Sequence, residues 1–150
     1  MVNSRSKGMG GEREIIAILT DELGGDANGL SFKRDIDQYR QSDLGDIICS
    51  DPAFPFVIEV KRYRAGYGIQ PAWWDQCCNA AKAAGRGKLP LLVYRYDRLP
   101  WRWRFPVAAL AGMDNYLPAA DLHEQYDWRY GVECDQMTAM MIIREHLADV

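Results

Sequence analysis

Residues 45–61 read Gly-Asp-Ile-Ile-Cys-Ser-Asp-Pro-Ala-Phe-Pro-Phe-Val-Ile-Glu-Val-Lys, a pattern typical of two β-strands joined by a turn. The runs 44–49 and 56–61 are rich in β-branched and aromatic residues, which favour strands. The connection between them contains two prolines and two polar residues, which favour a turn. Because the connection is short, the two strands are expected to pair as a hairpin.

Side-chain alternation sorts the second strand into two faces. Glu59 and Lys61 are two residues apart, so both leave the same face, about 6.7 Å apart along the strand. Ile58 and Val60 take the opposite, apolar face. Pairing of the two strands can bring Asp46 beside Glu59.

This grouping of Asp46, Glu59 and Lys61 points to metal-dependent chemistry on phosphate. Two neighbouring carboxylates repel each other unless a cation joins them. Oxygen ligands in a chain with only two histidines favour a hard ion, Mg²⁺ or Mn²⁺. A lysine beside the pair can orient a water or stabilise charge on a phosphate, as phosphodiester hydrolysis requires. The alternative is an ordinary salt bridge on an exposed strand.

A helix is expected at residues 10–23, because its apolar residues recur at helical spacing and Gly24-Gly25 follows. On this helix Glu12 lies within about 20° of Leu19 and Leu23, whereas Glu14 points elsewhere. Glu12 is therefore on the buried stripe, where a carboxylate needs a partner.

The remaining pattern completes an α/β fold. A second helix is expected at 71–84, since Pro71 begins it and Gly85 follows it. Aromatic and basic residues alternate in 101–105, so a strand there would separate them by face. We also expect strands at 30–34 and 91–96, a polar loop at 35–42 and a closing helix at 136–147, while 107–134 has no clear pattern. This order predicts a mixed central sheet flanked by helices, as one domain spanning 1–150.

Charge is unevenly distributed along the chain. The net charge is −3, but residues 1–110 hold 16 Lys/Arg against 13 Asp/Glu, and residues 111–150 hold 2 against 8. The mildly basic body suits a nucleic-acid partner. The acidic segment, about 111–150, is expected to form a solvated surface of the domain or part of an interface.

Composition argues against several other classes of protein. The four cysteines have neither zinc-site nor disulfide spacing, so we expect buried free thiols. No apolar run reaches the length of a membrane span and no signal peptide is apparent, so cytoplasmic residence without a membrane partner is the expectation. We expect four tryptophans to fill the core or a dimer interface rather than stack on bases: Trp73, Trp74, Trp101 and Trp103. The Met137–Ile143 cluster is expected to be core or a dimer contact.

Several segments together resemble the archaeal-type Holliday junction resolvases of the PD-(D/E)XK superfamily, over about residues 5–105. The Asp…Glu-x-Lys core is common to the whole superfamily, whereas the opening Gly-x-x-x-Glu-Arg-Glu is more specific to the resolvases. The resemblance implies a restriction-endonuclease-like fold. It rests on Gly10-Gly11-Glu12-Arg13-Glu14, Arg34, Gly45-Asp46-Ile47-Ile48, Ile58-Glu59-Val60-Lys61 and Gln76.

By this resemblance, Glu12, Asp46 and Glu59 would be metal-site carboxylates. The Val60 carbonyl would add a further oxygen ligand, and Lys61 would position the attacking water. The implied cofactor is Mg²⁺, for which Mn²⁺ would substitute.

The resemblance also implies a homodimer that cuts four-way junction DNA and leaves 5′-phosphate and 3′-hydroxyl ends. Gln76 would lie at the edge of the site, and Ser42 would match a serine in the loop before Asp46. Members of the family are usually basic, and this chain is not. Candidate contacts to phosphate, which give sequence-independent affinity, include Arg13, Arg34, Arg62 and Arg64.

Three alternatives remain open from the sequence. The same chemistry suits a restriction- or repair-like nuclease acting on duplex or single-stranded DNA. A non-catalytic DNA-binding protein can keep the fold, although the intact carboxylates and Lys61 argue against it. An RNA-processing nuclease is the third alternative, because loops and dimer surfaces set the substrate.

Overall fold

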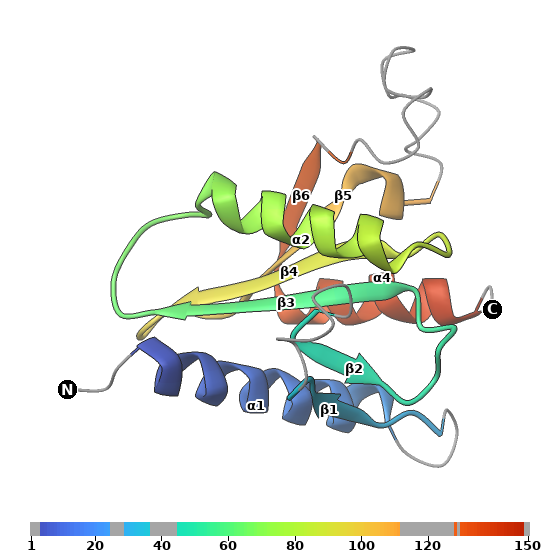
Figure 1. The fold of residues 1–150 in the computed structure, drawn as a ribbon, viewed down its shortest axis with the longest axis horizontal. Coiled ribbons are helices and arrows are strands. Elements are labelled where there is room, and N and C mark those ends of the chain that lie inside the picture. The colour runs from blue at the N-terminus through green and yellow to red at the C-terminus, as the bar shows by residue number, and fades with distance from the viewer. Residues whose placement is uncertain (1–3, 25–28, 37–44, 112–127, 129, 149–150) are drawn as a thin grey trace.

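The computed structural model describes residues 4–24, 29–36, 45–111, 128 and 130–148. Its elements follow the order helix, three strands, helix, two strands, a short 3-10 helix, a strand and a helix (Figure 1). Their bounds are α1 (Ser4–Leu23), β1 (Phe32–Arg34), β2 (Ile47–Cys49), β3 (Phe56–Tyr63), α2 (Pro71–Ala84), β4 (Leu89–Tyr96), β5 (Arg102–Pro106), η1 (Val107–Ala109), β6 (Gly131–Cys134) and α4 (Gln136–Ala148).

These strands form one mixed sheet in the order β1-β2-β3-β4-β5-β6. Among the described strands, only β3 and β4 pair in parallel, and α2 makes the crossover between them, as a parallel pair requires. The neighbouring pairs are antiparallel. The predicted α/β fold is therefore confirmed.

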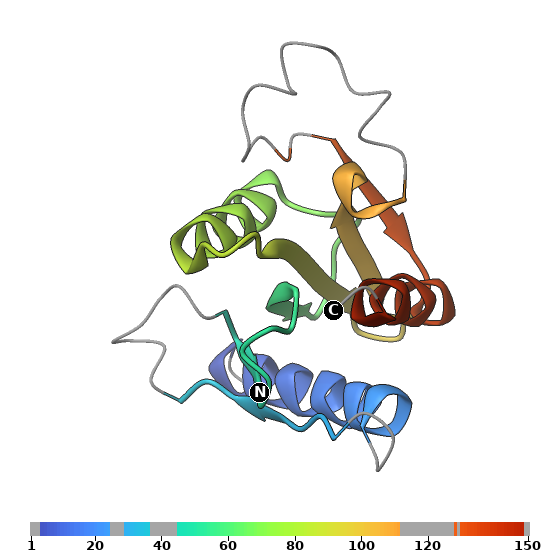
Figure 2. The ribbon, with the colours of Figure 1, turned by 90° about the vertical axis from the view of Figure 1, so that its right-hand side faces the viewer.

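Helices cover both faces of the sheet, with α2 on one side and α1 and α4 on the other (Figure 2). Val57, Leu92 and Tyr94 pack under α2. Ile58, Val60 and Val93 belong to the larger core cluster with α1 and α4. The alternation predicted for β3 is confirmed, since residues 57 and 58 lie in different clusters.

The predicted hairpin is also confirmed: β2 and β3 are antiparallel, with Ile47 opposite Ile58. Strand β2 starts at Ile47, so Asp46 lies just before it rather than within it. Helix α2 has the predicted bounds. Strand β5 places Trp103 and Phe105 in the core and its arginines on the opposite face, as its alternation predicts.

Two parts of the sequence prediction differ from the structure. Helix α1 starts at Ser4 rather than at residue 10, because its first turns lack the apolar spacing by which a helix is recognised. Strand β6 was not predicted. It is four residues long, pairs only with β5 among the described strands, and has no buried residue to produce an alternating pattern.

The side chains expected in the core are mostly there. Trp73, Trp74, Trp101 and Trp103 are buried. All four cysteines are free thiols, but the expected burial holds only for Cys77 and Cys78. Cys49 and Cys134, at the ends of the short strands β2 and β6, are partly exposed. In α4, Met140 and Ile143 are buried, whereas Met137 and Met141 are exposed. Within the described residues, none of the helices has both the length and the apolarity that crossing a bilayer requires.

Candidate active site

The approach of Asp46 to β3 depends on Gly45. This glycine has a φ of +76°, and a Cβ atom there would lie 2.6 Å from the Ile58 carbonyl oxygen. Only glycine adopts that conformation without strain and leaves room for β3. The Asp46 backbone N–H can then donate to the same carbonyl over 2.8 Å, while Oδ2 of Asp46 accepts from the Val60 N–H over 2.8 Å.

This docking places two carboxyl groups together. The Asp46 and Glu59 side chains lie within hydrogen-bonding reach of each other. Glu59 is 4% exposed, and its Oε2 atom has no hydrogen-bond partner among the described residues. Burial, and then the nearby Asp46 carboxylate, raise the pKa of Glu59 to about 9. Such a pair must share either a proton or a cation.

A third oxygen faces the same edge of β3. In an extended strand, the N–H and C=O of one residue point toward the same neighbour. Because the Val60 N–H bonds to Asp46, the Val60 carbonyl is directed toward that side as well. The unpartnered Glu59 oxygen, the Asp46 carboxylate and this carbonyl are hard oxygen donors, and they fit a hard divalent cation.

Lys61 and Gln76 come together beside this group. The Lys61 Nζ atom donates to the Gln76 Oε1 atom over 2.8 Å, which ties β3 to α2. Lys61 leaves the same face of β3 as Glu59, and its charge partly opposes the rise in the Glu59 pKa. The amide therefore holds the amine at the edge of the carboxylate pair.

The Glu12 side chain is buried, as its position on the helix predicts, and it forms an ion pair with Arg34. It is 7% exposed, and its Oε2 atom accepts from the Arg34 Nε atom over 2.6 Å. Burial raises the Glu12 pKa, and the bond to Arg34 opposes that rise. In the described part of the chain, no three His, Cys, Asp or Glu side chains are grouped closely enough to hold an ion as they stand. A metal-binding role for Glu12 stays a prediction.

The contacts of Glu14 were not predicted from the sequence. Its carboxylate accepts from Arg62 over 2.8 Å, from Arg95 over 3.1 Å and from the Trp101 indole over 3.0 Å. It thereby ties α1 to β3, β4 and the start of β5. Arg62, one of the expected phosphate contacts, is engaged in this network. The alternation of β3 contained the signal, because it puts Arg62 on the face of Val60, toward α1.

The other expected DNA contacts are scattered. Arg13 and Arg64 are exposed, whereas Arg34 is half-buried against Glu12. Ser42 lies outside the described residues. None of these positions is tested by the fold itself, so all four stay predictions.

Comparisons with known proteins bear on this site. Among solved structures, the chain is similar to Hjc, a Holliday junction resolvase from the archaeal hyperthermophile Archaeoglobus fulgidus. The two chains share 20% sequence identity with a TM-score of 0.43, and the match covers 66% of this chain and 75% of that chain. A search of curated proteins finds no match.

A family model matches far more of the chain, from residue 3 to residue 143. That span contains both carboxylates, Lys61 and Gln76. The family is described as "Phage putative PDDEXK endonuclease", and the chain belongs to this family of PD-(D/E)XK nucleases.

Proposed function

We propose that this protein is a Mg²⁺-dependent endonuclease that hydrolyses phosphodiester bonds in DNA, with Mn²⁺ able to replace Mg²⁺. The observation that carries the proposal is the pairing of buried Glu59 with half-buried Asp46, with an unpartnered oxygen on Glu59 and the amine of Lys61 beside the pair. A carboxylate pair of this kind is costly to bury unless a ligand joins it.

In this proposal the ion is held by Asp46, Glu59 and the Val60 carbonyl. When bound, it would polarise the scissile phosphate and lower the pKa of a water. Glu59 must first lose its proton to solvent, because its raised pKa keeps it protonated near neutral pH in the metal-free protein. Lys61 orients the attacking water, and Gln76 fixes the position of the Lys61 amine.

The substrate we propose is branched DNA, most specifically a four-way junction cut by a homodimer with two sites. The support is the resemblance of the opening segment, with Glu12, Arg13 and Glu14, to the archaeal-type resolvases. Glu12 would act as a further metal ligand once Arg34 moves to a phosphate of the DNA. Arg13, Arg64 and Ser42 would contact the DNA backbone.

The test is cleavage of a labelled synthetic four-way junction in Mg²⁺, beside a linear duplex of matched sequence, with Asp46→Asn as the control. Paired symmetric nicks on the junction alone, absent in the variant, are the expected result. Cleavage of both substrates would support the nuclease activity and contradict the proposed preference for junctions. If neither substrate is cut in Mg²⁺ or Mn²⁺, the proposed activity on DNA is wrong.

A further inference from the structure

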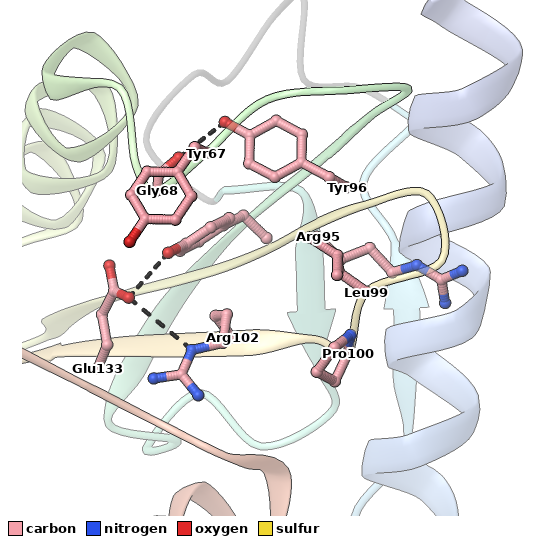
Figure 3. Close-up of a pocket in the computed structure, with 9 residues that line it drawn as sticks. Tyr67, Gly68, Arg95, Tyr96, Leu99, Pro100, Arg102 and Glu133 are labelled. Carbon is pink, nitrogen blue, oxygen red and sulfur yellow. Dashed lines mark hydrogen bonds and ion pairs between the residues drawn. The ribbon is translucent and has the colours of Figure 1, made fainter.

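A second feature lies on the same face of the sheet as Glu59 and Lys61. It is a pocket of about 340 Å³ between the loop that follows β3 and the strands β4 and β5 (Figure 3). Its walls combine aromatic rings with two arginines and one glutamate, and its volume falls in the range of small-ligand sites. The polar and aromatic part of the lining consists mainly of Tyr67, Tyr94, Tyr96, Arg102 and Glu133.

The loop wall of the pocket is fixed against β4 at two points. At Gly66, any Cβ atom would overlap the ring of Tyr96, so the loop backbone lies directly on that ring. The Tyr96 hydroxyl donates to the Gly68 carbonyl over 2.7 Å. Tyr67 lies between these two anchors with 98% of its surface exposed. The Tyr67 ring is therefore exposed to solvent, while the backbone on either side of it is held against Tyr96.

The strand side of the pocket is polar. The Tyr94 hydroxyl donates to Oε2 of Glu133 over 2.8 Å, and Arg102 Nε lies 3.9 Å from the same oxygen. Burial and this hydrogen bond raise the pKa of Tyr94, so its hydroxyl stays protonated. Arg102 is 42% exposed, and Figure 3 shows its guanidinium beside the Glu133 carboxylate.

Strand register places this pocket near the candidate site. Lys61 is paired with Tyr94, and Tyr94 is paired with Arg102, so these three side chains share one face of the sheet. Two strand spacings separate the first from the last, which is about 10 Å. The loop with Tyr67 begins where β3 ends, so one continuous segment links the catalytic strand to the pocket wall.

We infer that this pocket binds an unpaired nucleobase of the DNA, close to the bond that is cut. Tyr67 offers a face on which a base can stack. The Glu133 carboxylate can accept an N–H of a base, as carboxylates do from the amino group of cytosine. Arg102 can donate to a base carbonyl or to a phosphate.

This inference rests on the proposed function and narrows its substrate. A fully paired linear duplex does not offer a free base to the pocket, whereas a flap, a fork or an opened junction does. The nuclease should therefore favour DNA that has unpaired nucleotides beside the cleavage point.

The experiment compares two short labelled oligonucleotides of equal length, one of oligodeoxycytidine and one abasic throughout. Both carry the same phosphates, so their difference in affinity isolates the contribution of the bases. Binding is measured by fluorescence anisotropy in EDTA, which keeps cleavage out of the measurement. The proteins are the wild type, Tyr67→Ala, Tyr67→Phe and the matched control Tyr130→Ala, which removes a ring that is 40% exposed and outside the pocket.

The wild type, Tyr67→Phe and Tyr130→Ala should bind the oligomer with bases about tenfold more tightly than the abasic one. Tyr67→Ala should lose that difference and keep its affinity for the abasic oligomer. The inference is overturned if Tyr67→Ala retains the preference, or if the wild type has none. Wild-type cleavage of DNA in Mg²⁺, run in parallel with Asp46→Asn, tests the proposed function independently. If the wild type cleaves DNA but shows no preference for the oligomer with bases, only the base-binding pocket is contradicted. If it shows that preference but does not cleave, only the proposed nuclease activity is contradicted.

Discussion

The backbone N–H of Val60 donates to Oδ2 of Asp46 over 2.8 Å. The bond joins the residue just before β2 to the middle of β3, where Glu59 is buried. The backbone of β3 therefore helps to orient the Asp46 carboxylate beside Glu59. An Asn at this position can keep the acceptor through its amide oxygen and lose only the charge.

Because Gly45 packs directly against β3, substitution of this glycine should disturb the site strongly. Gly45→Ala should lower the free energy of unfolding by about 1–3 kcal/mol and reduce cleavage, because a Cβ atom meets the Ile58 carbonyl. Gly87→Ala is the matched control, since Gly87 has a similar φ of +71° with nothing near its Cβ position. Urea unfolding of both variants measures the difference. Equal losses would show that strain at positive φ, and not the contact with β3, sets the cost.

The buried Glu59 should make the metal-free protein less stable as the pH rises. Its pKa is about 9 in the folded chain, against an ordinary value of 4.5, so the folded state holds the proton more tightly. The stabilisation is complete below pH 4.5 and is lost as the pH rises toward about 9.

Glu59→Gln should remove this dependence, since the amide stays neutral and can donate to Asp46. The Tm of the variant should therefore rise relative to the wild type as the pH increases, by about 2–4 °C for each kcal/mol. Thermal melts in EDTA across this pH range measure the effect. Parallel Tm curves for the two proteins would mean that Glu59 is not held protonated.

Lys61 and Gln76 should contribute unequally to cleavage. Lys61→Ala should lower the single-turnover rate by about 10²-fold or more, because the variant loses the amine that lies beside the carboxylate pair and is proposed to orient the water. Gln76→Ala should lower it less, by about tenfold, since the amine remains but loses its 2.8 Å acceptor. Both variants should keep DNA affinity within a few fold. A Lys61→Ala enzyme with near-normal turnover would remove that residue from the mechanism.

Glu14 should matter for stability more than an ordinary surface carboxylate does. Glu14→Ala leaves three donors without their acceptor, and the expected loss is about 1–2 kcal/mol, limited by the partial exposure of the network. Glu22 is on the same helix as Glu14 and forms an exposed pair with Arg144 of α4. Glu22→Ala breaks this pair and should cost less than about 0.5 kcal/mol. Chemical denaturation distinguishes them. Equal costs would show that the Glu14 network contributes no more than a surface ion pair.

The hairpin of β2 and β3 could be predicted because its signals are local: β-forming runs, a proline-rich turn and strict alternation. Helix α2 was bounded by Pro71 and Gly85 for the same reason. Strand β6 could not be predicted, since four half-buried residues at the edge of the sheet produce no period.

Within the site, burial of Glu12 followed from helical geometry, but its bond to Arg34 did not. The hydrogen-bond partners of Glu14 could not be predicted from the sequence, because Arg95 and Trp101 lie 81 and 87 residues away in the chain. Local pattern contains no information on such contacts. The closeness of Lys61 and Gln76 was anticipated only through the resemblance to known nucleases.

The central claim is that Asp46 and Glu59 share one divalent cation. Its most direct test is calorimetric titration of Mn²⁺ into the metal-free wild type, Asp46→Asn and Glu59→Gln, near neutral pH in two buffers of different ionisation enthalpy. We predict that the wild type binds Mn²⁺ and releases a proton from Glu59, and that both variants bind at least about tenfold more weakly. Equal affinity in all three proteins, or binding by the wild type without proton release, would contradict the claim.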